Sequence, residues 1–587
     1  MRLKLLSLLF CLSIFFISYS QEIPYHISNV TVYEFIDELA NLKIIEINSC
    51  IKPYSRKFIA DKLLEAQGKS NQLNKRQKKE LDFYLKDFGK ELNGMQTMDF
   101  YFKKYLSEKD THISKRPDLF YYKDSLFTVT INPILGGNYF IKKSQSIYQR
   151  WNGAEVFATI GKHWGIYANL RDDYESEPLE KNTYFTQRTG VRYKSTNSGD
   201  YDYGAYSEMR GGITYSWNWG SFGIMKDHFE WGDNYNGANI FSGRTPSFAF
   251  IKLSLKPVKW FEFNYIHGWL FSDVIDSSRS YHYGNQNRNV FVGKWLTANM
   301  LTIIPFEKLN ISLGNSIIYS DVNQTSYLIP VLFYKSVDHS LNTNNQNGQN
   351  SQMFFNISSR NIKYLHLYFS CFIDELSLKR AFVKDKESSF LSNKVGFNLS
   401  NFPLQNINLI AEFTRTNPLT YQHFIPTTTF ASYSVNMGSY LRDNSQEIYF
   451  ALGYKPISKL HLNVSYTYAK HGENFIYGYD TININGPKIH YAIGGVPFMR
   501  NVTWESKIIS FKVQYELFHD AYFFIELIRN ETPDLGYTMN YLDPQTGALA
   551  IDSKTKKPAV MKVIDYYTPP FFQGKNNIIS CGLNLGF

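Results

Sequence analysis

One segment of the chain holds an unusual concentration of residues suited to ligand recognition: DHFEWGDNYNGANIFSGRTP, residues 227–246. Its aromatic rings could stack on pyranose rings, and its amide and charged groups could bond hydroxyls or acidic substituents. The candidate polysaccharide ligands are Trp231, Asp233, Asn234, Tyr235, Asn239 and Arg244. The same residues could instead build a loop that folds into a lumen and is locked there by hydrogen bonds. The sequence leaves both interpretations open.

Catalytic motifs are missing from the sequence. It contains no His-Glu-x-x-His, Gly-x-Ser-x-Gly, Walker loop or Cys-x-x-Cys. The adjacent acids Asp172-Asp173 and Asp374-Glu375 would point to opposite faces of a strand, so they make poor acid–base pairs. We therefore expect no enzyme, no metal and no cofactor. The net charge of +10 is modest for 587 residues, so we expect no nucleic-acid partner.

The first residues indicate export. Arg2 and Lys4 precede an apolar run from Leu5 to Ile17, and small residues follow before Gln21. This pattern predicts a signal peptide over residues 1–20. No later window offers the roughly 18 apolar residues of a membrane helix. The mature protein is therefore soluble, or it crosses a membrane as strands.

Residues 21–108 have helical periodicity. Thr31 to Glu34 reads as a capping box at the start of a first helix. A second predicted helix follows Pro53, and a third carries Leu81, Tyr84 and Phe88 on one face. These helices predict a small domain, joined by a linker at 109–123 to all that follows.

The helical region resembles an S-layer-homology module, in which a Pro-x-Ser-Arg sequence enters the second helix. Here that sequence is Pro53-Tyr54-Ser55-Arg56. The resemblance implies a periplasmic tether in which Ser55 and Arg56 contact peptidoglycan or wall glycan. The alternative is that Arg56 only caps or solvates the helix.

From residue 124 to residue 587 the hydrophobic period is two. Ile213, Tyr215 and Trp217 alternate with polar residues, as do Leu309, Ile311 and Leu313, and the pattern recurs to the end of the chain. Such strands present an apolar face to lipid and a polar face to a lumen. The polar residues predicted to line the lumen are Glu262, Asn264, Glu412, Arg415, His461 and Asn463.

The connections favour a membrane barrel over a soluble β-sandwich. Tight links containing proline stand at 257–260, 305–308, 403–405 and 456–459, whereas long polar joins stand at 173–204, 272–289, 335–352 and 530–575. Short turns at one end and long loops at the other are typical of outer-membrane barrels. At about 10 residues per strand plus connections, the region predicts roughly 16–18 antiparallel strands.

The C-terminal sequence IISCGLNLGF alternates apolar and polar residues and ends in Phe587. In hydrocarbon the last strand must pair with the first, because every backbone group needs a partner. A final strand of this kind resembles the signal by which the barrel-insertion machinery recognises its substrates, and Phe587 would be the last residue of that signal.

Several blocks resemble the Wzi-type capsule-assembly outer-membrane family. They include Ile240–Pro246, Lys294–Leu301, Leu313–Tyr319, Tyr327–Tyr334 and Glu412–Tyr421. The resemblance implies a plugged barrel that holds surface polysaccharide at the cell exterior. The preceding helical module resembles the arrangement in Bacteroidota members, some of which carry gliding-motility labels. Asn315 stands where an acid is expected, which weakens any charge-specific role of that strand.

Three hypotheses follow. The first is an outer-membrane barrel, embedded in lipid, that binds or anchors capsular polysaccharide and assists its assembly. The second is a porin-like solute channel tethered to peptidoglycan. The third is an accessory subunit of a gliding or secretion complex.

Overall fold

The computed structural model describes residues 22–92, 118–143, 145–194, 204–284, 286–341, 349–376, 389–477, 491–492, 496–540 and 559–586. The predicted signal peptide lies outside these residues.

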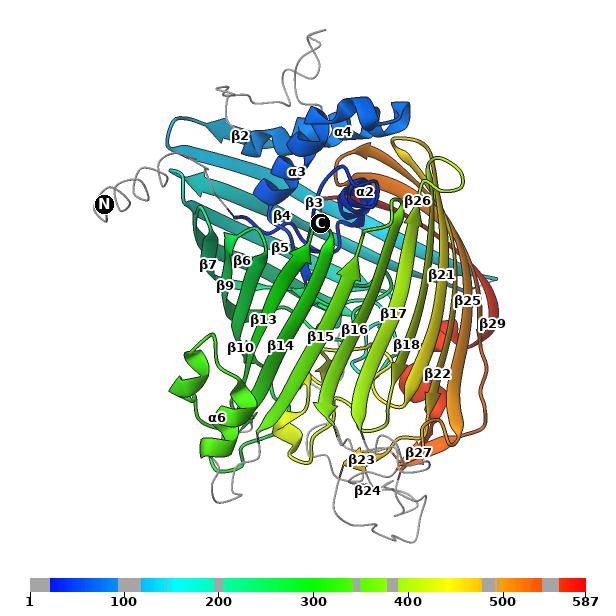
Figure 1. Cartoon of the computed structure of the whole chain (residues 1–587). Helices are drawn as coiled ribbons and strands as arrows, with labels where there is room; N and C mark the ends of the chain where they lie inside the picture. The colour runs from blue at the N-terminus through cyan, green and yellow to red at the C-terminus, as the bar shows by residue number, and fades with distance from the viewer. Residues whose placement is uncertain are drawn as a thin grey trace, which may run out of the picture.

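A closed antiparallel barrel of eighteen strands forms the body of the protein (Figure 1). In ring order the strands are β3 (Phe127–Lys142), β4 (Gln145–Ile160), β5 (Trp164–Glu175), β6 (Ala205–Trp217), β7 (Gly220–Asp227), β9 (Phe248–Val258), β10 (Phe261–Leu270), β13 (Lys294–Phe306), β14 (Leu309–Ser320), β15 (Asn350–Ser359), β16 (Leu365–Glu375), β17 (Phe390–Ser400), β18 (Ile407–Thr416), β21 (Ser445–Ile457), β22 (Leu460–Gly472), β25 (Val502–Phe518), β26 (Ala521–Thr532) and β29 (Gly574–Leu585). The predicted strand number and closure are confirmed.

The ring closes between its first and last strands. Residues 579–585 of β29 pair with residues 135–141 of β3. The N-terminal part of β3, residues 128–131, pairs instead with a short additional strand, β2 (Phe120–Lys123). This strand lies within the predicted linker. The first strand of the ring therefore has hydrogen-bond partners along most of its length.

Side-chain alternation sets the two faces of the wall. On β14, Leu313 points outward and is 54% exposed, whereas its neighbour Ser312 points into the barrel and is fully buried. The outward residues Ile213, Ile525 and Leu583 are similarly exposed. The wall thus has an apolar outside and a largely polar inside, as the period of two predicts.

The two ends of the barrel differ. Turns such as 259–260, 307–308 and 519–520 form the short-turn end, and long connections form the opposite long-loop end. The proline-containing links lie at the short-turn end, as predicted. The remaining short elements are β1 (Ile51–Lys52), β8 (Glu230–Trp231), β11 (Tyr281–Tyr283), β12 (Gln286–Arg288), η3 (Thr325–Leu328), α6 (Tyr334–Leu341), η4 (Pro426–Thr428), β19 (Ala431–Ser432), β20 (Val435–Asn436), β23 (Ile476–Tyr477), β24 (Tyr491–Ala492), β27 (Thr538–Asn540), β28 (Val560–Lys562), α8 (Val563–Tyr567) and η5 (Pro570–Phe572).

Three helices form the N-terminal unit, residues 22–92. They are α2 (Val30–Asn41), α3 (Arg56–Gly68) and α4 (Lys75–Phe88), with the short turns η1 (Ser70–Gln72) and η2 (Gly89–Glu91). The predicted apolar faces meet in one core that includes Phe35, Leu63 and Tyr84. In the described part of the chain, no helix is long and apolar enough to cross a membrane.

The predicted capping box at Thr31 is wrong. The helix α2 begins earlier, at Val30, and its N-cap Asn29 makes no side-chain capping bond. Thr31 therefore lies inside the first turn, where its hydroxyl is 3.5 Å from Glu516 Oε1 of the barrel. A capping box forms instead at α4, where Asn74 and Gln77 bond each other's backbone amides.

The N-terminal unit is seated in the short-turn mouth of the barrel rather than standing free of it (Figure 1). Arg360, in the turn after β15, pairs with Asp37 and donates to Asn41 Oδ1 at 2.9 Å and Ser49 Oγ at 3.0 Å. His519, in the turn after β25, lies 2.7 Å from Asp87. Strand β1 pairs with β8 inside the lumen. The unit therefore acts as a plug held by polar contacts.

We predict that Arg360→Ala lowers the free energy of opening of α2 from the barrel by about 3–5 kcal/mol. The reason is that Asp37 would keep a buried charge without its partner. Hydrogen–deuterium exchange of α2 in the solubilised full chain measures the change. Lys363→Ala, an exposed site in the same turn, is the control. Equal exchange in the two variants would contradict the prediction.

Candidate functional site

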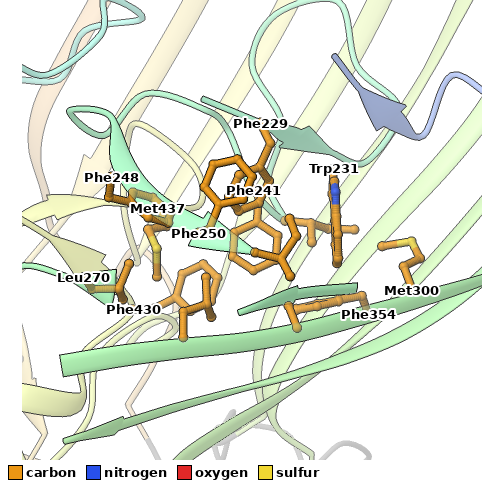
Figure 2. Close-up of a cluster of buried hydrophobic side chains, with 14 of the residues drawn as sticks. Phe229, Trp231, Phe241, Phe248, Phe250, Leu270, Met300, Phe354, Phe430 and Met437 are labelled. Carbon is orange, nitrogen blue, oxygen red and sulfur yellow. The ribbon is translucent and has the colours of Figure 1, made fainter. Parts of the chain in front are cut away.

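The lumen loop, residues 228–247 between β7 and β9, turns inward and packs an aromatic cluster against one side of the wall (Figure 2). The ring centroids of Trp231 and Phe241 are 5.4 Å apart, and Phe241 lies 5.5 Å from Phe354 on β15 and 5.2 Å from Phe430 in the β18–β21 loop. Cys50 of the plug joins the same cluster. Residues from the plug, the lumen loop, the wall and a long loop thus share one apolar core, which fills that side of the lumen.

The six candidate sugar ligands lie in this lumen loop, and five of them form side-chain hydrogen bonds with protein groups. Asp233 accepts from Asn356 Nδ2 at 2.7 Å, and Asn239 Nδ2 donates to the Ser392 carbonyl at 2.9 Å. Further contacts run from Tyr235 to Asp37 and Glu412, from Asn234 to the Gly232 carbonyl, and from Arg244 to the Thr186 carbonyl.

This placement matches the alternative of a loop locked into the lumen. Trp231 is 1% exposed and Asn239 is fully buried, so neither presents a surface to an external glycan. The segment composition alone could not separate the two interpretations, because a buried polar loop and a sugar site use the same residue types.

Five of the six residues predicted to line the lumen point inward. Glu412 accepts from Lys394 Nζ at 3.0 Å across the strand pair, and Asn264 bonds Ser254. Glu262 contacts the plug through Asn48, and His461 lies 3.8 Å from Glu34 of α2.

The prediction for Arg415 is wrong. It is three residues from the inward Glu412 and two from the outward Phe413, so it shares the outer face. Its guanidinium lies 3.9 Å from the ring centroid of Phe498. The period of two was sufficient to exclude Arg415 from the lumen.

The candidate wall-binding pair is built into the plug. Ser55 caps α3 by accepting from the Phe58 amide at 3.1 Å. Arg56 is 3% exposed, pairs with Glu91 and Asp87 at 2.7 and 3.3 Å, and lies over Phe157 of the barrel wall. Its guanidinium therefore faces protein rather than wall glycan. Phe587 lies outside the described residues, and its recognition by the insertion machinery stays a prediction.

A cavity of about 430 Å³, the loop-end cavity, lies among the long loops. Its lining combines the aromatic rings Phe475, Tyr537, Tyr566 and Tyr567 with the amides Gln422, Asn436 and Asn474 and the charged groups Arg442, Asp443 and Glu473. The residues come from three connections, 417–444, 473–501 and 533–573. The sequence did not reveal this site, because a single sequence carries no signal that these distant loops meet.

Hydrogen bonds organise the floor of the loop-end cavity. Asp443 Oδ2 accepts from the Leu419 amide and from Gln422 Nε2, each at 2.9 Å. Tyr567 donates to Asn474 at 2.6 Å and stacks on Phe185 with centroids 3.9 Å apart. Such a preorganised surface of rings, amides and charges can stack on a sugar and bond its hydroxyls.

Further cavities lie inside the barrel. The lumen cavity, about 440 Å³, runs between the plug and the lumen loop, and a third of about 310 Å³ lies beside Lys455 and His461 at the short-turn mouth. A neck of about 20 Å³ shares Arg442 with the loop-end cavity and Arg244 with the lumen cavity. A space of that size holds about one water molecule.

The neck is closed by paired groups. Arg188 and Glu180 are 3.0 Å apart, and Arg442 donates to the Asn182 carbonyl. Among the described residues, the neck itself is therefore too small for solutes larger than water.

Within the described ranges, one group of side chains has the spacing of metal ligands. Ligand atoms of His26, Asp227 and His228 lie within 4.8 Å of one another, with His26 Nε2 and His228 Nδ1 3.0 Å apart. Imidazole and carboxylate would suit a zinc-like divalent cation. Arg210 donates to Asp227 at 3.1 Å, which opposes a further positive charge there.

Comparisons with known proteins give structural likeness only. No family model matches the chain, and no curated protein matches its sequence. Among solved structures, Wzi of Escherichia coli, described as a carbohydrate-binding β-barrel involved in group 1 capsule assembly, is 10% identical with a TM-score of 0.49, over 97% of this chain and 100% of that chain.

Porins of Pseudomonas aeruginosa are also similar. OccK8 (OprE) is 9% identical with a TM-score of 0.40, over 78% of this chain and 97% of its own. OccD3 (OpdP) is 10% identical with a TM-score of 0.40, over 78% of this chain and 90% of its own. At such identities the likeness describes the barrel and assigns no family.

We predict that the contribution of Asp443 to the stability of the β18–β21 loop falls as pH rises. Burial raises the pKa of Asp443 to about 6, above its ordinary 3.8. A carboxyl whose pKa is raised on folding favours the folded loop at low pH. That advantage, about 3 kcal/mol, is lost as pH rises from about 4 to 6.

Hydrogen–deuterium exchange of residues 417–424, corrected for the intrinsic rate, measures this change. Asp443→Asn keeps an acceptor without a charge. The difference in opening free energy between the wild type and this variant therefore isolates Asp443 from other titrating groups of the loop, such as His423, whose pKa burial lowers to about 4. A difference in opening free energy between wild type and variant that is the same at pH 4.5 and pH 8 would contradict the prediction.

Proposed function

We propose that the chain is an outer-membrane barrel that binds surface polysaccharide in its loop-end cavity and assists polysaccharide assembly at the cell surface. The apolar outer wall suits lipid, and short turns face the periplasm in barrels of this kind. The plug then lies at the periplasmic mouth and the loop-end cavity opens outside the cell. Lipid and surface polysaccharide are the partners.

The observation that carries this proposal is the neck of about 20 Å³ beneath a cavity twenty times larger. A ligand in the loop-end cavity is too large to continue into the lumen cavity through this neck. A large, ring-lined site closed on its inner side suits retention of a polymer segment rather than its passage.

Binding of purified capsular or other surface polysaccharide to the detergent-solubilised full chain tests the proposal. Tyr566→Ala and Asn474→Ala should each weaken binding about tenfold, or about 1.4 kcal/mol, by removing a stacking face or a hydroxyl partner. Tyr283→Ala removes a ring that is 78% exposed in another long loop and should not change affinity. Equal affinity in all three variants would refute the site.

A solute channel is the second candidate, because the neck shares lining residues with both neighbouring cavities. Local opening at Arg188 or Tyr440 would join them. Membership of a gliding or secretion complex stays an untested prediction, as does wall binding by the helical unit.

Planar-bilayer recording separates the two candidates. We expect no steady current from the wild-type protein, and a measurable current when Arg188→Ala and Tyr440→Ala together widen the neck. A steady ohmic current from the unmodified protein would favour the channel and contradict retention.

A further inference from the structure

The outer strap, residues 321–341 between β14 and β15, lies against the outside of the barrel. Figure 1 shows its helix α6 outside the wall, near the loop ends of β10, β13 and β14. Tyr327 and Tyr334 of the strap are at most 1% exposed. They pack on Tyr265, Ile317 and Tyr319, which share the outward face of their strands with the exposed Leu313 and Trp269. The strap thus covers wall that would otherwise face the surroundings.

A polar seam fastens the strap to the wall. Asn299 Nδ2 donates to the carbonyls of Pro330 and Leu332 at 2.8 and 3.0 Å. Asn315 accepts from the Tyr334 amide at 2.9 Å and donates to Asn299 Oδ1 at 2.6 Å.

Both asparagines lie in the middle of their strands, β13 and β14, on the outer face. An amide exposed to hydrocarbon there would lack any hydrogen-bond partner, which is strongly unfavourable. The strap supplies the partners that lipid cannot supply.

The outer face of the strap is apolar. Leu328, Ile329, Val331 and Phe333 are 41, 48, 74 and 46% exposed. No charged residue occurs from Val322 to Tyr334. The neighbouring wall strands also expose apolar side chains, such as Leu313 and Trp269. Charged Lys335 and Asp338 follow on α6.

We infer that the strap is inserted in the lipid leaflet on the long-loop side, with acyl chains as the occupant of its outer face. This inference rests on the proposed membrane embedding of the barrel. It changes the expected place of the β14–β15 connection, because a long join at this end of a barrel is otherwise expected in water. The strap widens the surface that contacts lipid on one side of the barrel. Its hydrogen bonds to Asn299 and Asn315 are then enclosed between the apolar wall and the apolar face of the strap.

Spin labels on single introduced cysteines test the inference in the full chain in lipid bilayers. The background is Cys581→Ser, since Cys50 and Cys371 are buried. The test site is Val331→Cys. Leu313→Cys reports the bare wall, and Tyr283→Cys, with 78% exposure against 74% for Val331, reports a water-facing long loop.

The label at 331 should match the label at 313, with high accessibility to oxygen and low accessibility to a water-soluble nickel complex. The label at 283 should show the reverse. If 331 behaves like 283 while 313 is lipid-exposed, the inference fails and the barrel proposal stands. If 313 is also water-exposed, the membrane embedding itself fails.

A second measurement tests the seam. Adding Asn299→Ala and Asn315→Ala together should narrow the spectral lines at position 331, because the strap would lose its anchors and move more freely. Ser358→Ala, at a buried wall position away from the strap, is the matched control. Unchanged lines in the double variant would show that these amides do not hold the strap.

Discussion

Backbone pairing around the ring is the constraint on which the rest of the structure depends. Eighteen strands satisfy one another's amides and carbonyls only if β29 meets β3, and that junction spans seven residue pairs. A sheet left open there would present an unpaired edge, which hydrocarbon does not tolerate. Closure at this strand number also encloses a lumen too wide for wall side chains to fill alone.

The chain fills this lumen from both ends. The plug enters through the short-turn mouth and pairs β1 with β8, while the lumen loop brings Trp231 and Phe241 to meet it. Polar contacts such as Asp37 with Arg360 hold the plug. The apolar cluster and hydrogen bonds such as Asn239 to the Ser392 carbonyl hold the loop. The plug and the lumen loop occupy the interior, and the loop-end cavity lies at the opposite end from the plug. This asymmetry suits binding of a ligand at one end better than passage of a solute from one end to the other.

Some of this architecture could be predicted from the sequence. Strand alternation, the proline turns and the helical faces around Phe35 and Leu81 depend on local periodicity, and the structure confirms them. Strand alternation alone could have excluded Arg415 from the lumen. It is three residues from the inward Glu412, so it lies on the opposite face of the strand. The predicted capping box at Thr31 is wrong because the helix begins one residue earlier, at Val30. Its N-cap, Asn29, makes no side-chain capping bond.

Other features depend on contacts between distant segments. Arg56 has the composition of a wall-binding residue, but Phe157 and Glu91 enclose it only after the plug is seated. The sequence of residues 327–334 does not predict that this segment lies on the outer wall. The loop-end cavity joins three loops, and no periodicity relates Asn474 to Tyr566.

Ring closure can be tested by crosslinking Cys581 to its register partner, Tyr139. Opposed residues in an antiparallel pair lie about 4.5–5.5 Å apart between Cα atoms, within disulfide range. After oxidation of folded Tyr139→Cys protein, mass spectrometry should find a peptide linking 139 to 581, and far less linkage from Ile141→Cys. No linkage at 139, or equal linkage at both positions, would contradict a closed barrel with this register.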